Sequence, residues 1–129
     1  MAKRPKQQRV LLIDDEVPLV RLLQLNLEQT GAYEVRVENH PRQALATARA
    51  FRPDIILCDV IMPEMSGGEV AAQLRDDPVL KETPIVFLTA VVSKQEAASR
   101  GGVIGGHPYL AKPVSIEEVV ACIEQHVKK

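Results

Sequence analysis

Two runs of the chain are apolar at every position, and they constrain the fold more than any other feature. The runs are Ile55–Cys58 (IILC) and Ile85–Leu88 (IVFL). A strand on a half-exposed sheet alternates apolar and polar residues, whereas a strand without polar positions is buried on both faces. Such strands are typical of a parallel sheet with helices on both sides. The two runs therefore predict an α/β fold.

The rest of the chain alternates strand-like and helix-like segments. Three further strands are predicted at Arg9–Asp14, Tyr33–Val37 and Tyr109–Ala111. The first helix is predicted from apolar residues at helical spacing, with Pro18 in its first turn and Gly31 after its end. Those apolar residues are Leu19, Leu22, Leu23 and Leu27.

Four more helices are predicted from start signals. Pro41 begins the second helix, and Ser-x-x-Glu motifs begin the next three at Ser66, Ser93 and Ser115. Each motif can form a capping box, in which the hydroxyl and the glutamate accept hydrogen bonds from free amide groups. Alternating strands and helices imply right-handed crossovers. We therefore expect a doubly wound, five-stranded parallel sheet of order 2-1-3-4-5, flavodoxin-like, with five helices on two faces.

Length and composition limit the organisation and the partners. The 129 residues fit one domain, which we expect over residues 9–129 after a flexible N-terminal tail of residues 1–8. The formal net charge of −1 does not suggest a polyanionic partner, so we expect no direct binding to nucleic acid. The longest early apolar stretch, Val10–Ile13, is too short to span a membrane or to act as a signal sequence.

The two cysteines and three histidines do not form a metal-binding motif. Cys58 and Cys122 lack ligand spacing and need no disulfide, which favours a reducing, cytoplasmic location. Cys58 is expected to be a small buried apolar residue. His40, His107 and His126 share no spacing and are expected to be surface or loop residues.

Polar residues lie at the ends of four of the five predicted strands. They are Asp14 and Asp15 after the first strand, Asp59 after the third, Thr89 after the fourth and Lys112 after the fifth. In a parallel sheet these ends lie on one edge, and the first and third strands meet at the switch point where such folds bind ligands. Neighbouring strands are about 4.8 Å apart, so the three carboxylates are expected to converge.

This set of residues suits phosphoryl transfer. Three clustered carboxylates repel one another and need positive charge nearby. Lys112 supplies one charge, and a divalent cation bound by hard oxygen ligands, such as Mg²⁺, would supply the rest. Asp59 could then attack phosphorus while Thr89 and Lys112 stabilise the transferring oxygens. Each residue alone has a simpler explanation, such as a helix cap or a surface lysine, but their joint occurrence favours a site.

Four segments resemble the receiver domain of bacterial two-component response regulators, close to the stand-alone chemotaxis type. They are VLLIDDE (Val10–Glu16), DIILCDVIMPEMSGGE (Asp54–Glu69), PIVFLTA (Pro84–Ala90) and YLAKPV (Tyr109–Val114). The resemblance implies that a histidine kinase or phosphotransfer protein phosphorylates Asp59. It also implies that Asp15, Asp59 and the backbone carbonyl of Ile61 bind Mg²⁺, with Asp14 acting through water.

The resemblance further implies a conformational switch. Lys112 would contact the phosphoryl group, Thr89 would move to bind it, and Tyr109 would change ring position in concert. The Lys112–Pro113 peptide bond is expected to be cis. A downstream protein target would bind the face formed by the fourth helix, fifth strand and fifth helix.

Two departures from the family pattern lead to further expectations. Four glycines occur in residues 101–106, which predicts a short or mobile fourth helix followed by a flexible loop. Ile61 and Val91, beside the expected phosphate, are apolar and offer no group to orient an attacking water. We therefore expect slow self-dephosphorylation.

Two alternatives remain open at this point. One is a receiver-like interaction module that works without phosphorylation, although such modules tend to lose the acidic residues that are complete here. The other is a small phosphatase of the haloacid dehalogenase class. That class needs a second aspartate two residues after the nucleophile, where this chain has Ile61, so we favour a phosphorylated signalling protein over an enzyme.

Overall fold

A computed structural model of the chain describes residues 7–90, 103–104 and 107–127. The strands are β1 (Gln8–Ile13), β2 (Tyr33–Glu38), β3 (Ile55–Asp59), β4 (Ile85–Thr89), β5 (Val103–Ile104) and β6 (His107–Ala111). The helices are α1 (Val17–Gln29), the short 3-10 helix η1 (Pro41–Gln43), α2 (Ala44–Phe51), α3 (Gly67–Arg75) and α5 (Ile116–His126). None of the helices in these ranges is long and apolar enough to cross a membrane.

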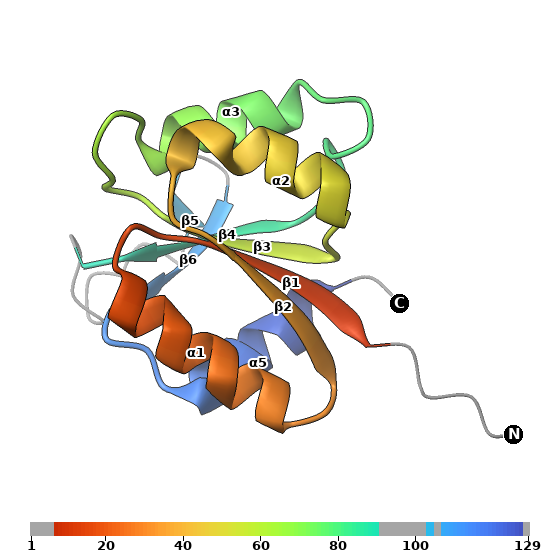
Figure 1. The fold of residues 1–129 in the computed structure, drawn as a ribbon, viewed down its shortest axis with the longest axis vertical. Coiled ribbons are helices and arrows are strands. Elements are labelled where there is room, and N and C mark those ends of the chain that lie inside the picture. The colour runs from red at the N-terminus through yellow and green to blue at the C-terminus, as the bar shows by residue number, and fades with distance from the viewer. Residues whose placement is uncertain (1–6, 91–102, 105–106, 128–129) are drawn as a thin grey trace, which may run out of the picture.

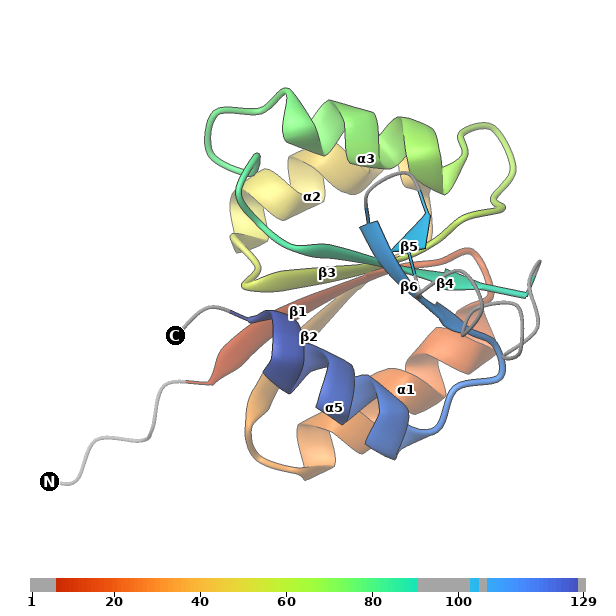
Figure 2. The ribbon, with the colours of Figure 1, turned by 180° about the vertical axis from the view of Figure 1, so that it is seen from behind.

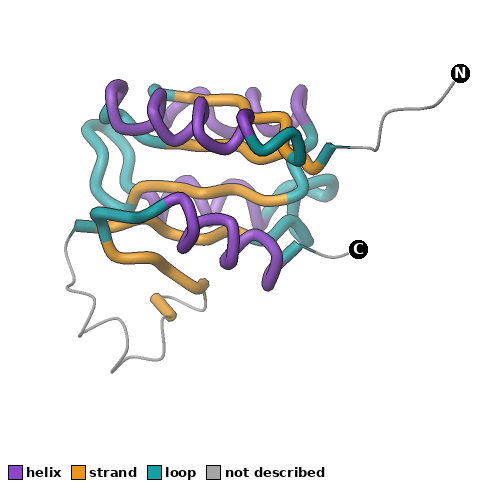
Figure 3. Tube along the Cα trace, turned by 90° about the horizontal axis from the view of Figure 1, so that it is seen from below, coloured by secondary structure: helices purple, strands orange, loops and turns teal. Residues whose placement is uncertain are grey.

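The strands form one sheet in the order β2-β1-β3-β4-β6-β5. The first five of these are parallel, and β6 is the predicted fifth strand, so the predicted order 2-1-3-4-5 is confirmed. The two-residue β5 pairs antiparallel with β6 at the edge of the sheet, where a loop was expected (Figure 3). Valine and isoleucine between two glycine pairs favour such a short extended pairing.

Helices cover both faces of the sheet, as predicted. α2 and α3 lie on one face, and α1 and α5 lie on the other (Figures 1 and 2). Four α-helices lie within the described residues. The predicted fourth helix, its Ser93 cap and most of the glycine-rich segment fall on residues 91–102 and 105–106, outside them.

Each central strand is buried on both sides because its side chains alternate between two cores. On β1, Leu11 and Ile13 pack toward α2 and α3, whereas Val10 and Leu12 pack toward α1 and α5. All five positions of both β3 and β4 are buried. The inference from uninterrupted apolar runs is therefore confirmed.

One of the apolar residues that predicted the first helix is exposed in α1. Leu22, one of the apolar residues at helical spacing, is 58% exposed, whereas Val20, Leu23 and Leu27 are buried. Positions 20, 23 and 27 follow the helical repeat on one face, and Leu22 lies about 100° away from Leu23 around the axis. Helical spacing of the leucines therefore predicted the helix, but Leu22 lies outside its buried face.

The predicted capping boxes at Ser115 and Ser66 differ in the number of hydrogen bonds they form. Ser115 Oγ accepts a hydrogen bond from Glu118 N at 3.1 Å, and Glu118 Oε1 accepts one from Ser115 N at 3.1 Å, which is a full capping box. Ser66 Oγ accepts a bond from Glu69 N at 3.2 Å, but no return bond from the glutamate side chain is present among the described residues. Both serines therefore begin helices as predicted, with one box complete and one half-formed.

Candidate functional site

The predicted polar residues meet at the carboxyl edge of the parallel strands. Ile13 on β1 lies opposite Cys58 on β3, so the residues that follow them, Asp14 and Asp59, are neighbours. Thr89 ends β4, and Lys112 follows β6. Asp14, Asp59 and Thr89 are all buried, although their side chains are polar.

The three aspartates form one compact cluster. One carboxylate oxygen from each of Asp14, Asp15 and Asp59 lies within 4.8 Å of the others. Asp14 and Asp59 are buried, and Asp15 is partly exposed. Hard oxygen donors at this spacing fit a small divalent cation such as Mg²⁺.

Asp59 lies in an environment that disfavours its ionised form. Burial, and then the charge of Asp14, raise the pKa of Asp59 to about 6. Lys112 and the backbone amides of Ile61 and Val60 act in the opposite direction but do not restore the pKa to its ordinary value. An added cation would relieve this repulsion, so the donor set fits a metal in charge as well as in chemistry.

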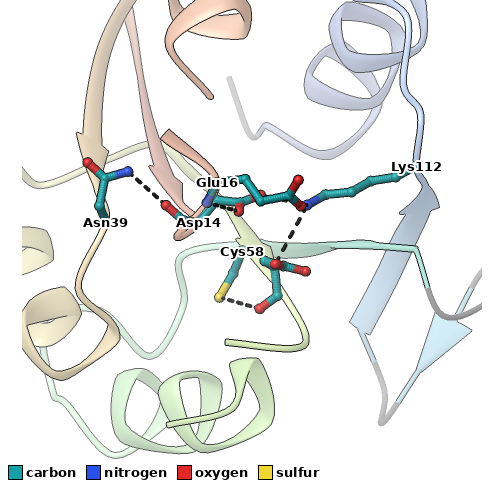
Figure 4. A network of polar contacts seen from close by, with 6 residues as sticks. Asp14, Glu16, Asn39, Cys58 and Lys112 are labelled. Carbon is teal, nitrogen blue, oxygen red and sulfur yellow. Dashed lines mark hydrogen bonds and ion pairs between the residues drawn. The ribbon is translucent and has the colours of Figure 1, made fainter. Parts of the chain in front are cut away.

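Lys112 is the cation that the chain itself provides. Its Nζ lies 2.9 Å from Asp14 Oδ2, 2.7 Å from Glu16 Oε1 and 3.6 Å from Asp59 Oδ2 (Figure 4). Burial alone would lower the pKa of Lys112, but the bonds to Glu16 and Asp14 and the nearby carboxylate charges outweigh it and raise the pKa. The lysine is therefore held in its charged form, and the peptide bond to Pro113 is cis.

Glu16 is a residue that sequence reasoning missed. Its carboxylate makes the shortest of the three contacts to Lys112, and its backbone N–H donates to Asp14 Oδ1 at 2.9 Å. The signal was present, because Glu16 is the third acid of the motif VLLIDDE. Glu16 was given no role because its position in the sequence does not show a contact with Lys112, which is 96 residues away.

Gly67 was read only as part of a helix start, yet it shapes the loop after Asp59. A Cβ at this position would lie 2.2 Å from the Asp59 carbonyl oxygen. Gly67 N also donates to Val60 O at 2.8 Å. The first turn of α3 therefore packs directly against the backbone of the phospho-acceptor candidate, and only glycine fits there.

Two of the strands that end at the site contain Cys58, on β3, and Tyr109, on β6. Cys58 is buried, and burial, followed by the charges of Asp59 and Asp14, raises the pKa of its thiol. The prediction of a small buried residue is thus confirmed. Tyr109 on β6 is 4% exposed, and its hydroxyl lacks a hydrogen-bond partner in the part of the chain that the structure describes.

The histidines are only partly as expected. His40 is an exposed residue before η1. His107 instead lies on β6 and is partly buried, with its ring edge toward Phe87 at a centroid distance of 5.4 Å. His126, the last residue of α5, is also partly buried. Sequence spacing did not reveal that β6 and α5 bring His107 and His126 to the same pocket.

The fold and the site together define a class: a doubly wound α/β domain with an acidic cluster and a lysine at the switch point of its sheet. Residues 10–124 match the response regulator receiver domain family. The chain belongs to this family, whose members are signalling proteins of two-component systems that interact with histidine kinases and downstream targets.

Relatives of two kinds match the chain. It is 32% identical over 120 residues to the polar-differentiation response regulator DivK of Brucella anthropi, covering 92% of this chain and 94% of DivK. It is 36% identical over 124 residues to the alkaline phosphatase synthesis transcriptional regulatory protein PhoP of Bacillus subtilis, covering 95% of this chain but 49% of PhoP. The chain therefore spans about half the length of PhoP and nearly all of DivK.

A solved structure agrees with this assignment. The chemotaxis protein CheY4 of Vibrio cholerae superposes with a TM-score of 0.79 at 32% identity. The alignment covers 93% of this chain and 98% of CheY4. The predicted fold class and the predicted resemblance to receiver domains are both confirmed.

Proposed function

We propose that this chain is a phospho-acceptor switch in which Asp59 receives a phosphoryl group from the phosphohistidine of a histidine kinase or phosphotransfer protein. One observation carries the proposal: Asp59 lies in a cluster with Asp14 and Asp15, with Lys112 Nζ 3.6 Å from its Oδ2. Membership of the receiver family supports it. The chain is thus a signalling protein that contributes catalysis to its own phosphorylation.

The proposed chemistry is a single group transfer. A carboxylate oxygen of Asp59 forms a bond to phosphorus while the phosphorus–nitrogen bond of the donor breaks. The electron pair of that bond stays with the imidazole, which takes up a proton. Lys112 is already charged and close to the reacting oxygen, so it can compensate charge without being drawn in from solvent.

The metal site is proposed on the same cluster. Asp15, Asp59 and the backbone carbonyl of Ile61 would bind Mg²⁺ directly, and Asp14 would act through water. When bound, the cation would neutralise charge on the transferring oxygens. The raised pKa of Asp59, to about 6, supports this assignment because it shows a carboxylate that needs a positive neighbour.

The proposed switch involves Lys112, Thr89 and Tyr109. A phosphoryl group at Asp59 would compete with Glu16 for Lys112 and would give the hydroxyl of Thr89 a new acceptor. The buried Tyr109 hydroxyl has no partner among the residues that the structure describes, and such a hydroxyl costs about 1–3 kcal/mol, so a small change can shift its position. The output is a shift between two conformations.

Partners and location follow as proposals. A downstream protein would bind the surface formed by the fourth helix, β6 and α5, of which β6 and α5 are described here. We propose a cytoplasmic location and no direct contact with nucleic acid or membrane. The apolar side chains at positions 116 and 120 of α5 pack only partly against the core, which suits a protein contact.

Incubation with acetyl phosphate and Mg²⁺, followed by intact mass measurement, tests the proposal. We expect the gain of one phosphoryl group by the native chain and none by Asp59→Asn. A matched control, Asp76→Asn, removes an exposed carboxylate away from the site and should leave the reaction unchanged. No gain by the folded native chain would instead support a receiver-like module that works without phosphorylation, and turnover of a generic phosphate ester would support a phosphatase.

A further inference from the structure

A second polar pocket lies at the opposite edge of the sheet from Asp59. Its volume is about 240 Å³. The start of β4, the start of β6 and the ends of α3 and α5 surround it. The distance from Ile85 to Thr89 along β4 is about 13 Å at 3.3 Å per residue, so this pocket is separate from the acidic cluster. Its polar lining residues are Arg75, Lys81, Glu82, Thr83, His107 and His126.

Arg75 and Lys81 give the pocket positive charge, and neither forms an ion pair with a carboxylate of the described residues. Elsewhere the arginines at positions 9, 42 and 49 form ion pairs with acidic side chains. Within the described residues, neither Arg75 nor Lys81 has such a pair. Two cations against Glu82, the one acid in the lining, leave a net charge of +1 with both histidines neutral, and protonation of His107 and His126 would raise it further.

The contact between Arg75 and His107 shows how this end of the domain is arranged. Arg75 Nη2 lies 3.3 Å from His107 Nε2. A guanidinium can only donate, so Nε2 is the acceptor and His107 is neutral, with its proton on Nδ1. Burial, and then the charge of Arg75, lower the pKa of His107. Arg75 thus donates a hydrogen bond to the neutral His107 ring, and an anion could replace this acceptor.

Charged, titratable and aromatic groups near His107 come from α3, the segment before β4, β4 and α5. They are Arg75 at the end of α3, Lys81 and Glu82 in the segment before β4, Phe87 on β4 and His126 at the end of α5. Three of these five groups are cationic or can become so, and one is acidic. The surroundings therefore disfavour a cation and suit an oxyanion.

We propose that this pocket binds a small oxyanion, a phosphate or carboxylate group, through Arg75 and Lys81, with His107 and His126 as additional donors. The planar guanidinium fits two oxygens of such a group, and the lysine adds a point charge. Bound anion would also favour protonation of His107, which then donates from both ring nitrogens. Because His107 and Tyr109 lie two residues apart on one strand, they face the same side of the sheet.

The three histidines allow a direct test in the intact chain. The imidazole NMR signals are followed during titration with inorganic phosphate in metal-free buffer at constant ionic strength, maintained with chloride. We expect the signals of His107 and His126 to shift saturably, with the pKa of His107 rising as phosphate binds. The signal of the remote, exposed His40 serves as internal reference and should stay in place. A parallel titration with acetate distinguishes a carboxylate preference from a phosphate preference.

Substitutions then separate a site from general charge screening. Arg75→Gln and Lys81→Gln should each weaken binding by about tenfold or more, since a charge-assisted hydrogen bond is lost. Both side chains are exposed, so circular dichroism should show a folded chain. Arg42→Gln removes one charge at a distant exposed ion pair and should leave the affinity unchanged.

Two results would overturn the proposal. One is a linear drift of all three histidine signals with phosphate and with acetate, which reports non-specific interaction with anions alone. The other is saturable binding that Arg75→Gln and Lys81→Gln weaken no more than Arg42→Gln does. Saturable shifts with one of the two anions only would keep the site and assign its ligand class.

Discussion

Replacing Asp59 by asparagine is expected to stabilise the metal-free fold. In the native chain this carboxylate is buried beside Asp14, and its pKa is raised from 3.8 to about 6. A carboxyl group whose pKa is higher in the folded than in the unfolded state binds protons more tightly when folded. At neutral pH the ionised Asp59 therefore destabilises the folded state. An uncharged asparagine of similar shape removes this destabilisation.

The magnitude and the pH range follow from the same shift. A change from 3.8 to about 6 corresponds to about 3 kcal/mol at most, at about 1.36 kcal/mol per pKa unit. The site lies at the edge of the sheet, so solvent screening reduces the expected gain to about 2 kcal/mol. Below pH 3.8 the group is protonated in both states and the gain vanishes. It should grow between pH 3.8 and about 6 and stay constant above that range.

Urea unfolding in EDTA at pH 7.5 and at pH 4.5 measures this difference. We expect Asp59→Asn to be more stable than the native chain by about 2 kcal/mol at pH 7.5, and by clearly less at pH 4.5. Asp76→Asn, at an exposed position, should change the free energy of unfolding by less than about 0.5 kcal/mol at either pH. Equal or lower stability of Asp59→Asn at pH 7.5 would refute the electrostatic account of the site.

Three further predictions concern the site and its supports. Phosphorylated Asp59 should hydrolyse slowly, because the 64% exposed Ile61 beside it has no group to orient water; a lifetime of seconds by mass spectrometry, without a phosphatase, would contradict this. Gly67→Ala should destabilise the fold by about 1–3 kcal/mol and slow phosphorylation, because the added Cβ would lie 2.2 Å from the Asp59 carbonyl oxygen. An unchanged urea midpoint and an unchanged phosphorylation rate would argue against this close packing. Ser115→Ala should cost about 1 kcal/mol through loss of the cap to Glu118, measured by thermal unfolding, whereas Ser115→Asp should restore most of it.

The sheet and the placement of the main site residues could be predicted because both depend on one-dimensional patterns. Uninterrupted apolar runs mark strands buried on two faces, and β3 and β4 are buried at every position. Once the strands are parallel, residues that follow them must share one edge. Asp14, Asp59 and Lys112 converge for this reason, without any knowledge of side-chain conformation.

Other features depend on three-dimensional contacts that no local pattern encodes. Glu16 contacts Lys112 because the lysine side chain extends across the carboxyl edge of the sheet toward the segment after β1 (Figure 4). Gly67 is required because α3 begins against the backbone of Asp59, whereas the sequence suggested only a helix start. The pairing of Arg75 with His107 likewise needs α3 and β6 side by side. In each case the sequence shows the residue type but not the residue that it contacts.

The energetics of the proposed switch show why Lys112 cannot act alone. Moving a two-state equilibrium from 1:99 to 99:1 takes about 5.5 kcal/mol. A charge-assisted hydrogen bond contributes about 1.5–3 kcal/mol, and Lys112 exchanges its 2.7 Å contact with Glu16 for a new one, so its net gain is smaller still. A bond from Thr89 to the phosphoryl group likewise replaces an existing interaction and adds a similarly reduced amount, and a partner for the Tyr109 hydroxyl would add about 1–3 kcal/mol. Only the sum of these contributions reaches about 5.5 kcal/mol, so loss of the Tyr109 hydroxyl in Tyr109→Phe should leave phosphorylation intact while weakening the conformational response.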